Sequence, residues 1–257
     1  MGQTREIVKQ ADKTPEIKKE IGESLTLLME LCDMKAERFQ QHIEENLRTG
    51  KIDGESLKIP VDHIISHWSD YRCTTKQTQD ITKKVAESIK DIFQGTTESV
   101  INGIASLAGS AIEAIVGTGE GTEHTSQVYT CCTDGSGIAA SLVRFDMMIW
   151  SRNITASALL KYMESALTIV VYKSTIDVSK ITFNDFRNIY LEVLERGVDP
   201  NLPREKREKE IISAIEFART VYNELKKDSS NNKPTTIEDL RNRVPVNLVK
   251  TTQLKKS

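Results

Sequence analysis

The clearest periodic signal in the chain is a long run of apolar positions near its N-terminus. Thr14 suits the cap of a helix, and Pro15 suits its first position. Apolar or small residues then recur at intervals of 4-4-3-4-4-3-4-4, at Ile17, Ile21, Leu25, Leu28, Cys32, Ala36, Phe39, Ile43 and Leu47. Gly50 follows as a stop signal. The pattern predicts one nearly straight helix of about 50 Å, which suits an elongated bundle or an assembly.

Four further segments show the spacing of an amphipathic helix: residues 75–94, 155–171, 182–197 and 203–225. The first has its apolar stripe at Ile81, Val85, Ile89 and Ile92. The second carries apolar residues at helical intervals, namely Leu159, Leu160, Met163, Leu167, Val170 and Val171. The third opens on Thr-Phe-Asn-Asp, a variant of the capping box. Together with the first helix, these segments predict a mainly all-α protein.

Three regions are less regular. Residues 61–73 (VDHIISHWSDYRC) fit either a short helix or a strand. Residues 126–137 predict a strand that ends in a turn at Asp134-Gly135. Residues 138–150 could complete a hairpin with that strand or form another helix. We therefore expect an elongated helical bundle that, if residues 138–150 are extended, carries a small β-hairpin around residues 126–150.

The segment 99–116 has an unusually wide apolar face. Its apolar positions are Val100, Ile101, Ile104, Leu107, Ala111, Ile112, Ile115 and Val116. The opposite face is built of small, nearly uncharged residues, whereas a surface helix normally carries Lys and Glu there. One interpretation is a central helix whose small residues allow close packing. The other is a membrane segment, because a helix of this length would span about 27 Å, close to the thickness of the hydrocarbon core.

Composition and charge narrow the class of protein. The chain has 257 residues, is 28% charged and only 5% aromatic, and has a formal net charge of −2. This near-neutral charge argues against binding to nucleic acid. Four cysteines are too few for a disulfide scaffold, and the N-terminus lacks the apolar run of a secretory signal. We expect a cytoplasmic protein as synthesised, with release or membrane association as a later step.

Candidate chemical motifs are weak. His63 and His67 lie four residues apart, as two zinc ligands on one helix face would. The glutamate that zinc proteases carry between these two histidines is missing. Cys131 and Cys132 are more simply explained as small apolar residues than as a metal or redox pair. The glycine-rich loop at 117–121 follows a helix rather than a strand, which argues against dinucleotide binding. The sequence therefore predicts no enzyme activity, no catalytic or metal site, no cofactor and no small-molecule substrate.

The C-terminal region differs from the rest of the chain. We expect a helical bundle domain at 1–228, followed at 229–257 by a linker, a short helix and an extended basic tail. The tail mixes positive and apolar residues, among them Arg241, Arg243, Val246, Leu248 and Lys250. Such a segment could add a strand to a sheet edge of a neighbouring subunit, or lay its basic side chains on an acidic helix face. The alternative is a solubilising tail without a partner.

In its layout, with long helices beside a central apolar segment, the part 15–116 resembles α-helical pore-forming toxins, although no specific motif carries the likeness. The resemblance implies a membrane-active protein that is soluble until triggered, with 99–116 as the membrane segment and a lipid membrane as a partner. The alternative is a self-assembling structural or scaffold protein that uses the long first helix and the tail for subunit contacts. Both hypotheses predict a homo-oligomer.

Overall fold

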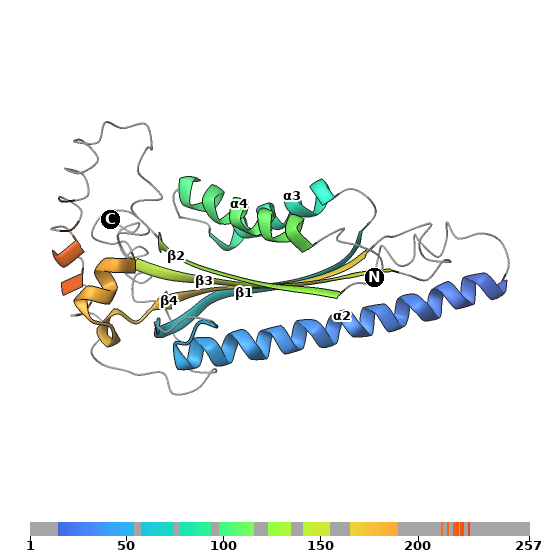
Figure 1. Cartoon of the computed structure of the whole chain (residues 1–257), viewed down its shortest axis with the longest axis horizontal. Helices are drawn as coiled ribbons and strands as arrows, with labels where there is room; N and C mark the ends of the chain where they lie inside the picture. Colours follow the sequence, from blue (N-terminus) through green and yellow to red (C-terminus); the bar gives the residue numbers. More distant parts are fainter. Residues whose placement is uncertain are drawn as a thin grey trace, which may run out of the picture.

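The computed structural model describes residues 15–53, 58–74, 78–93, 98–115, 123–134, 141–154 and 165–189, with positions 212, 215, 218–220, 222, 223 and 226 (Figure 1). In chain order the elements are α2 (Pro15–Thr49), β1 (Val61–Thr74), α3 (Thr78–Ile92), α4 (Glu98–Ile115), β2 (Glu123–Asp134), β3 (Ser141–Asn153), β4 (Ser165–Ile176) and the 3-10 turn η2 (Val178–Lys180).

The four strands form one antiparallel sheet in the order β1-β4-β3-β2. Figure 1 shows three layers, with α3 and α4 on one face of the sheet and α2 on the other. The two helices of the upper layer connect β1 to β2, the strands at opposite edges of the sheet. The N-terminal end of α2 projects beyond the strands (Figure 1).

The two faces of the sheet are built by alternate residues, because successive side chains in a strand point to opposite sides. Odd-numbered residues of the central strands face α3 and α4, namely Val143, Phe145, Met147, Ile149, Leu167, Ile169 and Val171. Even-numbered residues face α2, namely Met148, Trp150, Ala166, Val170 and Tyr172, and they pack on Cys32, Phe39, Ile43 and Leu47. The inner stripe of the long helix thus fills one of the two main cores.

The observed sheet corrects the expected fold class: the protein is not a mainly all-α helical bundle. The clearest error concerns β4, since residues 155–171 suggested a helix and residues 165–176 form a central strand. Nearly every residue of β4 is buried, because both faces of the sheet are covered. Such a strand lacks polar alternation and has the continuous apolar sequence that periodicity cannot separate from a buried helix. The proposed hairpin is real, but it forms half of a larger sheet.

The segment 99–116 corresponds to α4, and its apolar face packs in the protein core. Ile104, Ile112 and Ile115 are buried against α3 and the sheet, and Val100, Ile101 and Ala111 are partly buried there. Leu107 is 36% exposed on the outside, and Val116 lies outside the described residues. Among the described helices, none is both long and apolar enough to cross a bilayer. The descriptions all-α and helical bundle are wrong because of the sheet, and the description pore-forming conflicts with this structure, in which the candidate membrane segment packs in the core.

Candidate protein interface

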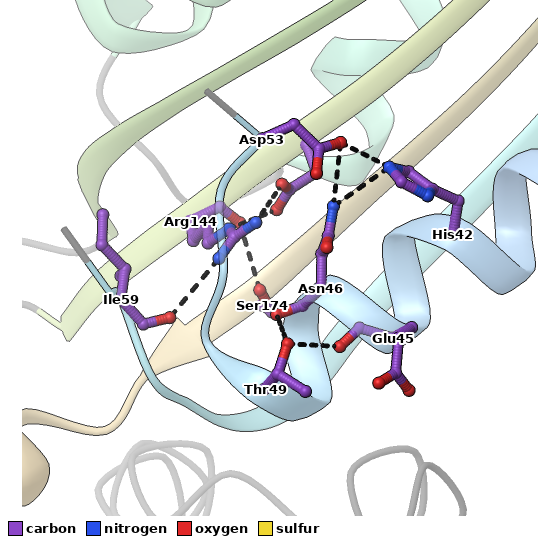
Figure 2. A network of polar contacts seen from close by, with 9 residues as sticks. His42, Glu45, Asn46, Thr49, Asp53, Ile59, Arg144 and Ser174 are labelled. Atoms are coloured by element: carbon purple, nitrogen blue, oxygen red, sulfur yellow. Dashed lines mark hydrogen bonds and ion pairs between the residues drawn. The ribbon is translucent and has the colours of Figure 1, made fainter. Parts of the chain in front are cut away.

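A buried ion pair lies between β3 and the C-terminal end of α2. Arg144 and Asp146 are two residues apart on β3, so both face α2, and their side chains are 0% and 1% exposed. The guanidinium donates two hydrogen bonds to the carboxylate, at 2.7 Å from Nε and 2.6 Å from Nη2. A third, from Nη1, reaches the carbonyl of Ile59 at 3.4 Å (Figure 2). Burial raises the pKa of Asp146 although Arg144 opposes that effect.

The connector after α2 is held by a second polar group. Figure 2 shows His42 and Asn46, one turn apart on α2, pointing at the carboxylate of Asp53. Burial raises the pKa of Asp53, but contacts with His42, Asn46 and Gln127 outweigh it and leave the pKa below its ordinary value. Gly50, at φ +70°, turns the chain out of the helix, and its carbonyl accepts a hydrogen bond from the Ile59 amide at 2.7 Å. The end of the helix is thereby tied to the sheet.

The middle of α2 is fastened to the sheet by two more contacts. The ammonium of Lys35 pairs with Glu123 at the start of β2 and lies 5.3 Å from the ring centroid of Trp150. The indole of Trp150 donates to the same carboxylate at 2.7 Å, and these partners hold the pKa of Glu123 below its usual range. Tyr172 on β4 donates to Glu44 at 2.7 Å. The long helix is therefore fixed by polar contacts from Lys35 to its C-terminal end.

The histidines considered as metal ligands in the sequence do not act together in the described part of the chain. His63 and His67 lie on β1 rather than on a helix, and each contacts different residues. The His63 ring lies 3.1 Å from both Asp62 and Thr175, whereas His67 stacks on Tyr172 at 5.3 Å between centroids. Among the described residues, no three His, Cys, Asp or Glu side chains come together as metal ligands.

The side of α2 that faces away from the sheet has a distinct composition. Eight exposed residues recur there at intervals of 4-3-4-3-4-3-4, and we call them the outer stripe: Glu16, Glu20, Glu23, Leu27, Glu30, Met34, Glu37 and Gln41. This spacing follows one face of a helix. Leu27 is 67% exposed and Met34 is 54% exposed, and they are two of the four large hydrophobic side chains exposed among the described residues.

The charge of the outer stripe is entirely negative. It contains five glutamates and no basic residue. Lys19, beside the stripe, lies 3.9 Å from Glu23 in an exposed pair, which contributes little at the surface. Two further basic residues of α2, Lys18 and Arg38, are exposed outside the stripe, and Arg38 directly follows Glu37. The ammonium of Lys35 points toward Glu123. The stripe thus offers a fixed helical surface with two apolar side chains, seven residues apart, among carboxylates.

The outer stripe and the buried pair were both missed by the sequence analysis, which followed the inner apolar positions of the helix. Glutamates are common on the polar face of any helix. Their position on α2 becomes informative only when the structure shows that the opposite face packs on the sheet. Arg144 and Asp146 did leave a signal, because two charges interrupt the apolar segment SLVRFDMMIW at the same strand face. The candidate assembly tail, with Arg241, Arg243, Val246, Leu248 and Lys250, lies outside the described residues.

Comparison with known proteins adds no assignment, since no family model matches the chain and no curated protein matches it significantly.

Proposed function

We propose that this protein is a non-enzymatic, self-assembling structural protein whose subunits bind one another through the outer stripe of α2. The observation that carries the proposal is the exposure of Leu27 and Met34 on the same face of a helix of 35 residues. Single exposed hydrophobic residues are common on protein surfaces. Two exposed hydrophobic residues at heptad spacing lie on the same face of a helix. Helices commonly bind their partners through apolar side chains spaced in this way.

The attachment of α2 to the sheet supports the same function. An interface loses less conformational entropy on binding when its residues are already held in place. Three sets of contacts hold the helix: the polar group around Asp53, the pair of Lys35 with Glu123, and the hydrogen bond between Tyr172 and Glu44. The part of the outer stripe from Met34 to Gln41 is therefore a preformed surface.

The test is the mass of the particle in solution. We expect the wild-type protein, measured by size-exclusion chromatography with light scattering at several concentrations, to be an oligomer. The double variant Leu27→Glu/Met34→Glu removes both apolar contacts and places carboxylates where apolar side chains of the partner would have to cover them, which is costly. We expect it to elute as a single chain of 28.9 kDa.

A matched control comes from α4. Leu107 is also exposed, but it lies on the opposite layer of the protein. Leu107→Glu should therefore leave the mass of the oligomer unchanged, and circular dichroism should show that all variants are folded. A wild-type protein that stays monomeric at every concentration, or a double variant with the wild-type mass, would contradict the proposal.

A further inference from the structure

The charge of the outer stripe restricts what can bind to it. In a symmetric contact between two α2 helices, the five glutamates of each stripe would face those of the other. Like charges in close contact destabilise a complex, and the seam of a coiled coil requires apolar residues at most of these positions. The matching surface on a second copy must therefore be basic and must bring apolar side chains to Leu27 and Met34.

The C-terminal tail of the same chain has this chemistry. Residues 241–257 contain five basic residues and no acidic one, namely Arg241, Arg243, Lys250, Lys255 and Lys256. Because the whole chain carries −2 and the tail carries +5, residues 1–240 carry −7. The two parts of the molecule are thus strongly complementary in charge, although the net charge of the chain hides it.

We propose that residues 241–257 of one copy bind along the outer stripe of α2 in a neighbouring copy. This inference rests on the proposed function, since it names the partner of the same surface. The basic side chains of the tail pair with the glutamates, and its apolar side chains cover the two exposed hydrophobic residues. The contact joins head to tail, so each copy both donates a tail and receives one.

The spacing of the apolar residues agrees with this arrangement. Leu27 and Met34 are seven residues apart, about 10 Å along a helix. In an extended chain Val244, Val246 and Leu248 share one side and span about 13 Å, because each residue advances about 3.3 Å. Lys250 continues on the same side at one end of this apolar group, and Arg243 lies at the other end on the opposite side of the extended chain.

The edges of the sheet are weaker candidates for the same tail. The edge strand β2 carries two carboxylates, Glu123 and Asp134, and Glu123 is already paired with Lys35. The other edge strand, β1, carries Asp62 and Asp70 together with two histidines and an arginine. Neither edge strand brings five carboxylates onto one surface as the outer stripe does, so electrostatic attraction favours the stripe.

A charge-swap experiment in the full-length protein tests the pairing. The stripe variant Glu30→Lys/Glu37→Lys and the tail variant Arg241→Glu/Arg243→Glu should each convert the oligomer largely to the 28.9 kDa single chain in light scattering. Their combination restores opposite charges on the two surfaces. We therefore expect the fourfold variant to recover at least part of the wild-type mass, and we expect salt to weaken both assemblies.

The control is Glu87→Lys/Glu113→Lys, which makes the same charge change at exposed positions of α3 and α4 and should leave the mass unchanged. If the tail variant keeps the wild-type mass while Leu27→Glu/Met34→Glu lowers it, the tail is not the partner and the assembly through α2 stands. If the fourfold variant stays monomeric after both parent variants dissociate, the pairing is also overturned. A tail bound to its own α2 would leave a monomeric wild-type protein, which contradicts both proposals.

Discussion

Replacing Asp146 with alanine should lower the free energy of unfolding by about 3–5 kcal/mol, because it leaves a buried guanidinium without its counter-charge. The Arg144 side chain is fully buried, and it donates two hydrogen bonds to Asp146. The remaining bond to the Ile59 carbonyl is long and cannot replace a carboxylate. Urea denaturation followed by circular dichroism measures the change.

The double variant Arg144→Met/Asp146→Leu separates the ion pair from the space it occupies. It removes both charges and fills the site with apolar side chains, so it should be more stable than Asp146→Ala. The exposed pair of Arg48 with Glu45 provides the comparison, and Arg48→Gln should leave the denaturation midpoint unchanged. If Asp146→Ala has no more effect than Arg48→Gln, the buried pair does not stabilise the fold as expected.

Replacing Ile112 with aspartate should have an effect at least as large, roughly 4 kcal/mol or more, because it removes a core side chain and buries an unpaired carboxylate. Ile112 is completely buried among residues of α3 and the sheet. The measurement is again urea denaturation, with the thermal midpoint as a second readout.

Ser106→Asp introduces the same charge on the exposed side of the same helix. Surface changes of this kind usually alter stability by less than about 0.5 kcal/mol, so the two variants should differ strongly. Equal stability of Ile112→Asp and Ser106→Asp would mean that the apolar face of α4 does not pack in the core.

The sequence predicted the helices better than the strands, and the reason is physical. The long helix was expected from Pro15 to Gly50 and spans Pro15–Thr49, because one apolar stripe and clear end signals define it. The helix at 99–116 was also located; its apolar face packs in the core, but most of its face of small residues is exposed, so the helix is not in a central position. The strand β4 failed because burial on both faces removes the polar alternation that identifies a strand.

The candidate site was less accessible to sequence analysis than the fold. The heptad spacing of exposed residues on α2 is informative only when the opposite side is known to pack on a sheet. The pairing of Arg144 with Asp146 could be guessed, because the two residues are close in the sequence. The hydrogen bond from Arg144 to the carbonyl of Ile59 could not, because 85 residues separate them. By contrast, the basic tail is evident from composition alone.

The most direct test of the central claim, assembly through the outer stripe, is site-specific photocrosslinking. Gln41 is an uncharged member of the stripe, so a photoreactive phenylalanine can replace it without changing the charge of the surface. The same group at Ser106, on the exposed side of α4, provides the control. We expect irradiation to give covalent dimers from position 41 and none above background from position 106. Absence of dimers from position 41, or equal yields from both positions, would contradict assembly through α2.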